Sequence, residues 1–196
     1  LCSAINNTDI NTRLGWYSDS VDSGAQALSG SNVSQQDAKE LKGGGWNGET
    51  TFPLVQGTDC AGVVVAVHAD KDRGLLHKRC LIRSCHRVDG FDSFENIWMA
   101  SDYDGAFAQF VKTKASEVFT INSDWDDEEL GSLPCAYATA ENMIHRCRVS
   151  QRDRILITGA SGGVGTALLQ LSKRRGSYII ALLIKSCWIM NFKKIF

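Results

Sequence analysis

The sequence predicts a β-rich first part over residues 1–122, followed by the opening of an α/β domain over residues 123–196. Short β-branched and aromatic runs separated by polar segments fill the first part. In the second part an apolar run, a glycine turn and an apolar helical pattern follow one another directly. A chain of 196 residues has room for one large domain, or for one domain and part of another.

The strands expected in the first part share β-branched, aromatic or alternating apolar residues. They are residues 60–67, 79–84, 105–111 and 117–121. Residues 18–51 are rich in Gly, Ser, Asp and Asn, and residues 85–104 are polar, so both segments are expected to be loops.

The second part is expected to contain two helices and then one βαβ unit. Acidic residues at 126–129 suit the first turn of a helix, and residues 134–149 have a helical pattern. The unit itself consists of a strand over 154–158, a helix over 164–175 and a strand over 177–184. Such units form parallel sheets with right-handed crossovers.

Composition excludes several classes of protein. Charged residues make up 22% of the chain and the net charge is −1, so no basic excess indicates a nucleic-acid partner. The apolar run over 178–184 is interrupted by Lys185 and is too short to span a bilayer, so no membrane span is expected. Seven cysteines without Cys-x-x-Cys spacing, and no signal peptide, favour free thiols in the cytoplasm.

The glycine turn after residue 158 has the spacing of a dinucleotide-binding turn. Small residues occupy its first, third and sixth positions, which are Ala160, Gly162 and Gly165. The N-terminus of the following helix offers N–H groups and a positive dipole to a pyrophosphate. A tight turn without a ligand is the alternative. The expected cofactor-binding residues are Gly159, Ala160, Ser161, Gly162, Gly163, Val164 and Gly165.

The residue that follows the second strand bears on which nicotinamide nucleotide is bound. NAD-binding turns are followed, about 20 residues on, by an acidic residue that holds the ribose hydroxyls. This chain has Lys185 there, and a cation suits a 2′-phosphate. NADP(H) is therefore preferred over NAD(H).

Four motifs together resemble the medium-chain dehydrogenase/reductase superfamily, over most of residues 1–182. They are Asn6–Tyr17, Phe52–Val64, Asp104–Val111 and Gly159–Gly165. The resemblance implies a GroES-like β-barrel catalytic domain, then the first βαβ of a Rossmann domain, with the active site in the cleft between them. It also implies a homodimer or homotetramer. Compared with the family, the chain looks truncated at both ends, residues 185–196 fit no family segment, and poor folding of the chain alone is expected.

The positions that match the family's catalytic zinc site carry few metal ligands. Asn6 stands where a cysteine would be, and Thr58-Asp59 stands where His-Glu would be. Only Cys135 keeps a ligand type, and one thiolate without an imidazole does not make a three-ligand zinc site. The chain thus resembles the zinc-lacking, quinone-oxidoreductase-like branch, and no metal is expected.

The resemblance implies roles for four side chains, each with a plainer alternative. Asn6 could donate to a substrate carbonyl, or only cap a turn. Thr8 matches a hydroxyl that relays protons, but could merely bond to the backbone. Asp59 is expected to be structural rather than a general acid, and Thr139 matches a position that contacts the nicotinamide, or bonds within its own helix.

The hypothesis is an NAD(P)H-dependent oxidoreductase that transfers hydride to a small quinone, enone or other activated carbonyl, without zinc. Three alternatives stay open. The first is a zinc-free alcohol dehydrogenase-like enzyme, the second is a non-catalytic nucleotide-binding regulator, and the third is a non-functional truncated product.

Overall fold

A computed structural model of the chain describes residues 2–14, 17, 44–45, 48–50, 52–89 and 95–183. The chain divides into two compact units, Leu1–Cys135 and Ala136–Phe196. Helix α3 (Asp127–Gly131) lies in the first unit, so this division falls later than the predicted boundary after residue 122. Most of the predicted loop over 18–51, and all of residues 185–196, lie outside the described residues.

A three-stranded antiparallel sheet organises the first unit. Strands β3 (Ala61–Val63), β4 (Arg79–Ile82) and β7 (Val118–Thr120) lie in the order β3-β4-β7. Leu81 pairs with Ala61 on one side and with Phe119 on the other. These three strands confirm three of the predicted four, and each is shorter than predicted.

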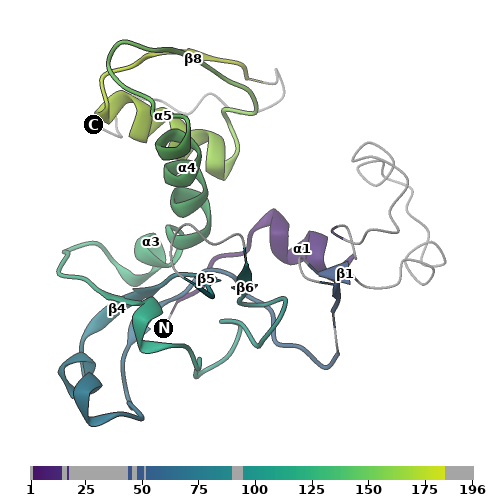
Figure 1. Cartoon of the computed structure of the whole chain (residues 1–196), viewed down its shortest axis with the longest axis vertical. Coiled ribbons are helices and arrows are strands. Elements are labelled where there is room, and N and C mark those ends of the chain that lie inside the picture. Colours follow the sequence, from purple (N-terminus) through teal and green to yellow (C-terminus); the bar gives the residue numbers. More distant parts are fainter. Residues whose placement is uncertain are drawn as a thin grey trace. The chain divides into compact units, whose positions relative to one another are not determined.

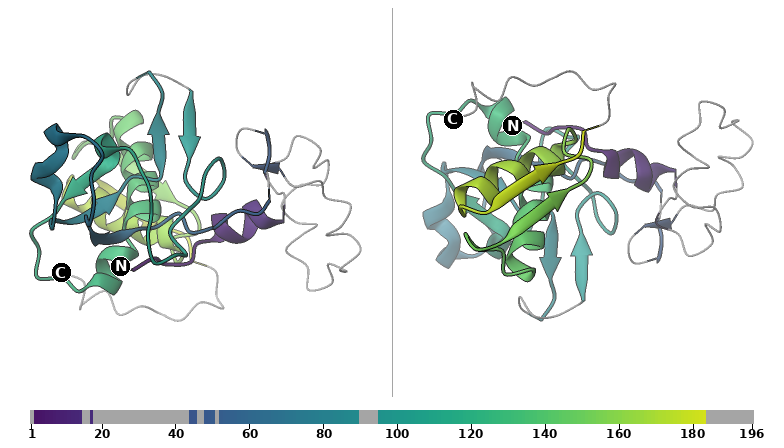
Figure 2. Two further views of the ribbon diagram at one scale, coloured as in Figure 1. Left: turned by 90° about the horizontal axis from the view of Figure 1, so that it is seen from below. Right: turned by 90° about the horizontal axis from the view of Figure 1, so that it is seen from above.

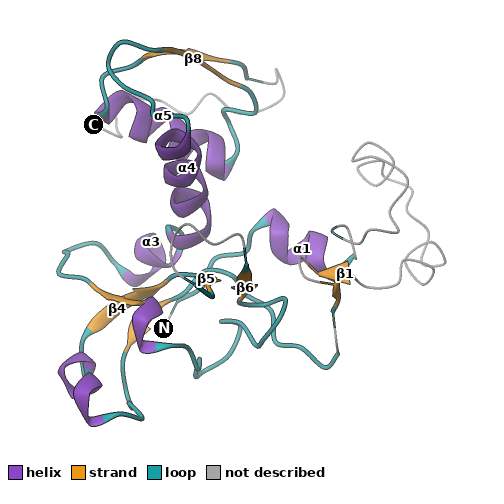
Figure 3. Cartoon of the chain, in the orientation of Figure 1, coloured by secondary structure: helices purple, strands orange, loops and turns teal. Residues whose placement is uncertain are grey.

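Short elements and loops make up the rest of the first unit (Figure 3). They are α1 (Asn7–Arg13), β1 (Gly44–Gly45), β2 (Gly48–Glu49), η1 (Asp70–Leu75), β5 (Cys85–Arg87), β6 (Asn96–Trp98) and η2 (Ala115–Glu117). The prediction of a loop over 85–104 is wrong in part, because β5 and β6 pair there as an antiparallel hairpin. Burial alternates along β5, where His86 is buried between half-buried Cys85 and Arg87. These residues are polar, so the sequence shows no apolar alternation that would predict the strand.

The predicted strand over 105–111 is also wrong. This segment has no strand geometry, although its backbone is well bonded: Gly105 N–H donates to Val55 O over 2.7 Å and Ala106 N–H to Gly57 O over 2.9 Å. A Cβ on Gly105 would lie 2.5 Å from Gly57 O, so the two segments touch backbone to backbone. Consecutive amides pointing to one neighbour are incompatible with a strand, whose amides alternate in direction.

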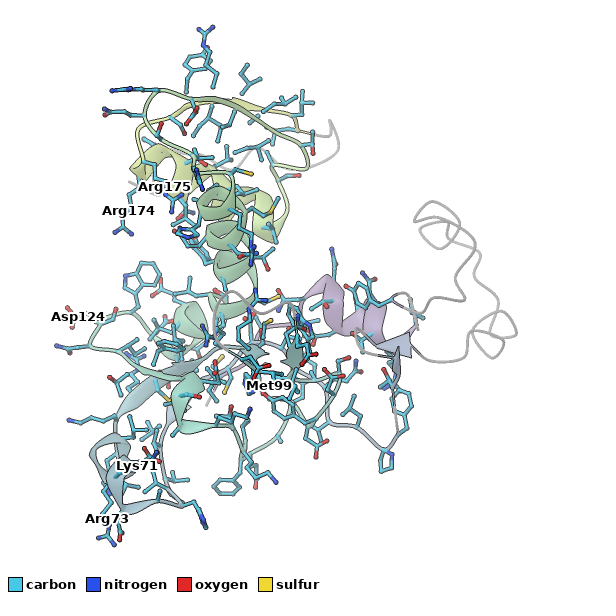
Figure 4. The ribbon with its side chains drawn as sticks, viewed as in Figure 1. Lys71, Arg73, Met99, Asp124, Arg174 and Arg175 are labelled. Carbon is cyan, nitrogen blue, oxygen red and sulfur yellow. The ribbon has the colours of Figure 1, made fainter. Side chains whose placement is uncertain are left out.

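The core of the first unit lies around Met99, which is fully buried (Figure 4). Cys60, Ile82 and Ala106 pack with it, and Tyr103 and Val111 cover this cluster from outside. The hydroxyl of Tyr103 lies 2.6 Å from Nε2 of the buried His86. An apolar cluster and a hydrogen-bonded aromatic pair therefore stabilise the hairpin side of this unit.

The second unit contains the predicted βαβ arrangement, which is confirmed. Helix α4 (Pro134–Arg146) leads into it from the end of the first unit, and β8 (Arg154–Ile157), α5 (Gly163–Arg174) and β9 (Tyr178–Ala181) follow (Figure 1). β8 and β9 pair in parallel, with Arg154 opposite Tyr178. α5 runs beside this pair, as the right-hand view of Figure 2 shows, and packs on it through Leu169.

None of the helices in the described part of the chain is long and apolar enough to cross a membrane.

Candidate functional site

The glycine turn connects β8 to α5 in the second unit. Gly159 has a φ of +61°, a left-handed conformation that glycine adopts without strain. A Cβ on Gly165 would lie 2.2 Å from Gly159 O, so helix and turn approach each other as closely as a glycine allows. Gly162 is the N-cap residue of α5, and its Cβ would have ordinary contacts only. Gly162 is therefore not required for packing.

The start of α5 presents unpaired backbone donors. The first intrahelical bond runs from Thr166 N–H to Gly162 O over 2.8 Å. The N–H groups of Gly163, Val164 and Gly165 precede that bond and have no acceptor within the helix. Gly163 is exposed, Val164 is half-buried and Gly165 is buried, while the N–H of Gly162 already donates to Gly159 O over 3.0 Å. This end of α5 combines amide donors that have no acceptor in the helix with the positive end of a helix dipole, an arrangement that binds phosphate groups.

Helix α4 lies next to the turn within the second unit. A Cβ on Gly163 would lie 3.7 Å from the Cβ of Ala136. Tyr137 donates from its hydroxyl to Gln170 Oε1 over 2.8 Å, which joins α4 to α5. Thr139 is exposed and lies three residues after Ala136, on the same face of the helix. The first turn of α4 therefore lies next to the start of α5, and cofactor binding by Thr139 stays a prediction.

A second constellation lies in the first unit, where Asp59 joins segments that are far apart in the sequence. Asn6 Nδ2 donates to Asp59 Oδ2 over 2.7 Å, and Cys135 N–H donates to Asp59 Oδ1 over 2.6 Å. Asn6 Nδ2 also lies 3.4 Å from Thr58 Oγ1. Asp59 is fully buried. All four positions that match the family's zinc site are therefore brought together.

Asp9 forms the other side of this constellation and is also buried. Its Oδ2 accepts the backbone N–H of Asn6 over 2.8 Å, and its Oδ1 accepts the N–H of Thr58 over 3.1 Å. Asn6 is the N-cap residue of α1, so the first bond belongs to the cap of that helix. Asn6 thus bridges two buried carboxyl groups, one through its backbone and one through its side chain.

Burial dominates the ionisation of these groups. It raises the pKa of both Asp9 and Asp59 above the ordinary carboxyl value. The hydrogen bonds that the two carboxyl groups accept from N–H groups lower the pKa and oppose this rise. The charge of Asp9 raises the pKa of Asp59 further. Burial and the nearby Asp59 raise the pKa of the Cys135 thiol to about 11. That thiol is protonated at neutral pH and is a poor metal ligand and nucleophile.

Thr8 lies in the first turn of α1 and contacts a tyrosine. Tyr17 Oη donates to Thr8 Oγ1 over 3.1 Å. Gln56 Nε2 donates to Asp9 O over 2.7 Å and so ties α1 to the segment before Thr58. Asp9 and Tyr17 both stand in the Asn6–Tyr17 motif, but their contacts depend on how α1 packs, so no local pattern indicates a role for them.

The side chains around Asp59 are not those of a metal site. Within the described residues, no group of three or more His, Cys, Asp or Glu side chains is placed to hold one. Asn6 directs its amide nitrogen, a donor, towards Asp59, and Thr58 has no imidazole to offer. The described residues do not fit a zinc ion at this place.

Comparison with known proteins gives relatives but no family model: no protein-family model matches the chain. Alcohol dehydrogenase 1 of Neurospora crassa is 30% identical over 162 residues, which are 78% of this chain and 46% of that protein. The acryloyl-coenzyme A reductase of Metallosphaera sedula is 24% identical over 140 residues, 67% of this chain and 42% of that protein. The chain therefore spans less than half the length of these relatives.

A solved structure is similar over almost the whole chain. It is a Sinorhizobium meliloti protein described as an alcohol dehydrogenase, with a TM-score of 0.75 and 31% sequence identity, over 94% of this chain and 47% of that one. The quinone oxidoreductase of Coxiella burnetii has a TM-score of 0.62 at 24% identity, over 94% of this chain and 45% of that one, which shows a shared fold.

Proposed function

Because the chain belongs to the medium-chain dehydrogenase/reductase superfamily, we propose that the protein is an NAD(P)H-dependent oxidoreductase that reduces a quinone, an enone or another activated carbonyl. The start of α5 is the observation that carries the proposal. Its amide donors without a helical acceptor, among them that of the exposed Gly163, and the close contact at Gly165 suit the pyrophosphate of a dinucleotide. The bound cofactor supplies the hydride, and the chain orients it and stabilises charge.

In this proposal the first unit corresponds to the GroES-like catalytic domain and the second to the first βαβ of a Rossmann domain. The residues that hold the cofactor are those from Gly159 to Gly165 together with Thr139. Lys185, whose charge favours NADP(H) over NAD(H), lies outside the described residues. The preference for NADP(H) therefore rests on the sequence alone.

The proposal also holds that the reaction proceeds without zinc. Asn6 and Thr58 replace two metal ligands, and the Cys135 thiol is kept neutral by burial. Charge that develops on the substrate oxygen must then be stabilised by hydrogen-bond donors, which is the task of an oxyanion hole. Asn6, Thr8 and Asp59 are the residues proposed to build that environment, with Asp59 holding Asn6 in place.

Binding and turnover test the proposal separately. Quenching of tryptophan fluorescence by NADPH and by NADH measures binding, and oxidation of NADPH in the presence of a panel of quinones and enones measures catalysis. The expected result is NADPH binding tighter than NADH binding, with turnover of at least one acceptor. Binding without turnover would favour a non-catalytic regulator, and no binding would contradict the proposal.

The variant Gly162→Val sharpens the binding test. Its Cβ has room, but the branched side chain would cover the exposed edge of the turn where a phosphate must approach. We expect the Kd for NADPH to rise about tenfold or more, with little change in the unfolding midpoint. Gly74→Val is the matched control, because Gly74 lies in η1 with nothing within 4 Å of its Cβ position.

The alcohol dehydrogenase names of two relatives favour a second candidate, a zinc-free alcohol dehydrogenase-like enzyme. The same preparation tests it in the other direction, by following NADP+ reduction with a panel of primary and secondary alcohols. Faster alcohol oxidation than quinone or enone reduction would support this candidate.

A further inference from the structure

An open cavity of about 700 Å³ lies in the first unit, between η1 and η2. η1 belongs to the connection from β3 to β4, and η2 directly precedes β7. The charged residues that line the cavity are Lys71, Asp72 and Lys114, and Leu75 and Ala115 add apolar surface. A volume of roughly 300–1,000 Å³ is usual for the site of a small ligand. The cavity shares no residue with the constellation around Asp59 or with the glycine turn.

The three charged side chains of this cavity have no partner in the described part of the chain. There, Lys71, Asp72 and Lys114 form neither an ion pair nor a side-chain hydrogen bond. The other two charged residues of η1 behave differently, because Asp70 and Arg73 pair with each other over 2.9 Å. η1 therefore pairs two of its charges internally and leaves the two that line the cavity available to a ligand.

The backbone on both sides of the cavity is held in place. Lys114 is the N-cap residue of η2, and its carbonyl accepts the N–H of Glu117 over 2.9 Å. Glu117 is buried and forms an ion pair with Arg83 over 2.7 Å, which anchors this wall in the unit. On the opposite wall, the N–H of Asp72 donates to Ala69 O over 3.0 Å. The charged side chains thus start from fixed positions, which lowers the entropic cost of binding.

Two ammonium groups and one carboxylate require a ligand of the opposite pattern, with two acidic groups and one cationic donor. The apolar surface of Leu75 and Ala115 suits a short hydrocarbon chain between those groups. We propose that the cavity binds an acidic amino acid, with Lys71 and Lys114 each holding one carboxylate and Asp72 holding the ammonium group. This inference goes beyond the proposed function, because no residue of the cavity takes part in the proposed reaction.

Isothermal titration calorimetry with L-glutamate tests the proposal on the whole chain. The titration is done at low ionic strength, because salt screens exposed charges. Two analogues separate the three contacts: glutarate lacks the ammonium group, and 4-aminobutyrate lacks one carboxylate. We expect the Kd for glutamate to be lower than that for either analogue by about threefold or more.

The variant Asp72→Asn gives a test with opposite signs for two ligands. It removes the partner of the glutamate ammonium group, so the Kd for glutamate is expected to rise about threefold. It also removes a negative charge that repels the carboxylates of glutarate, so the Kd for glutarate is expected to fall. A change of both affinities in the same direction would overturn the proposal.

Lys71→Gln and Lys114→Gln are each expected to weaken binding of both glutamate and glutarate by about threefold. Lys112→Gln is the matched control, since Lys112 is exposed but does not line the cavity, and it should bind as the wild type does. All four substitutions replace side chains without ion pairs among the described residues, so unchanged unfolding midpoints are expected. Glutamate that does not bind to the wild type at millimolar concentration, or that binds no tighter than glutarate, would overturn the proposal. Neither result depends on NADPH binding or on turnover.

Discussion

Asn6 Nδ2 and Asp59 Oδ2 are 2.7 Å apart although the two residues are 53 positions apart in the chain. The other oxygen of Asp59 accepts the N–H of Cys135, which is 76 positions further on. One fully buried carboxyl group therefore fixes the start of α1 and the first turn of α4 at the same point. Because neither contact is local, the geometry of this site depends on the folding of the whole first unit.

Replacing Asp59 with Asn tests this contact. Asn has one acceptor instead of two and would bring its own N–H groups against Asn6 or Cys135, so we expect the free energy of unfolding to fall by about 1–3 kcal/mol. Asp70→Asn is the control, because Asp70 is exposed on η1. Denaturant unfolding followed by fluorescence measures both variants. Equal stability of Asp59→Asn and wild type would contradict the structural role of Asp59.

The effect of Asp59→Asn should also depend on pH. Folding raises the pKa of Asp59, so its contribution to stability is largest below about 3.8 and decreases as the pH rises through the folded-state value. Asn does not titrate. The destabilisation caused by Asp59→Asn is therefore expected to be larger near pH 4 than near pH 7, as two denaturant series at about those pH values would show. A destabilisation that grew with pH would contradict the raised pKa.

His86 is expected to have the opposite effect to Asp59, because it makes the first unit less stable as the pH falls. Burial lowers its pKa, although Glu117 favours the charged ring, while Lys114 and Arg83 oppose it. Nε2 lies 2.6 Å from the hydroxyl of Tyr103. A neutral ring with its proton on Nδ1 accepts a hydrogen bond from this hydroxyl, and a protonated ring does not. The stability that neutral His86 contributes is present above about pH 6.5 and is lost as the pH falls below it.

The variant His86→Gln removes this titration and keeps an acceptor for Tyr103. We expect it to lose less unfolding free energy than the wild type when the pH is lowered from about 8 to about 5.5. His68→Gln is the control, since His68 is exposed, and it should follow the wild type. Parallel pH profiles for His86→Gln and the wild type would show that His86 does not titrate with unfolding.

Arg79 links β4 to the segment that leads into α3. Its guanidinium donates to Asp127 Oδ1 from Nε over 2.9 Å, and to the carbonyls of Ser123 and Trp125 over 3.0 Å and 2.7 Å. Lys cannot reproduce this planar set of donors, so Arg79→Lys is expected to lower the unfolding free energy by about 1–3 kcal/mol.

The matched control for Arg79→Lys is Arg73→Lys. Arg73 projects from the outer end of η1 (Figure 4), and both it and its partner Asp70 are exposed. A surface pair of this kind contributes little, so the control is expected to change stability by less than about 0.5 kcal/mol. If the two variants were equally stable, the contacts of Arg79 with the α3 segment would not contribute to the free energy of unfolding.

The parts of the fold that could be predicted from sequence are those with local patterns. The β8–α5–β9 unit was predicted because an apolar run, a small-residue turn and a helical pattern follow one another without interruption. The strand predicted over 105–111 was wrong. The aromatic residues Phe107 and Phe110 suggest a strand, but the backbone bonds of Gly105 and Ala106 to a distant segment determine the actual geometry. Local patterns cannot reveal such a partner.

The candidate site, too, could be predicted only in part from the sequence. The resemblance to a family identified Asn6 and Asp59 as residues of one site, and the structure places them in contact. It gave no role to Tyr17, whose hydroxyl donates to Thr8 Oγ1 over 3.1 Å. The raised pKa of Asp9 and Asp59 could not be predicted from the sequence either, because it arises from burial among residues of several segments.

Gly165→Ala should separate the packing role of the turn from phosphate binding. Its Cβ would lie 2.2 Å from Gly159 O and 2.7 Å from Ala160 Cα, and these are backbone atoms that cannot rotate away. We expect a loss of about 3 kcal/mol of unfolding free energy in the second unit, together with weaker NADPH binding. Gly74→Ala, which meets nothing within 4 Å, is expected to change neither quantity by a measurable amount. Gly162→Val should weaken binding without that loss of stability. If Gly165→Ala were as stable as the wild type and bound NADPH normally, the backbone of the turn would be able to move aside, and the close approach at Gly165 would not be what shapes the site.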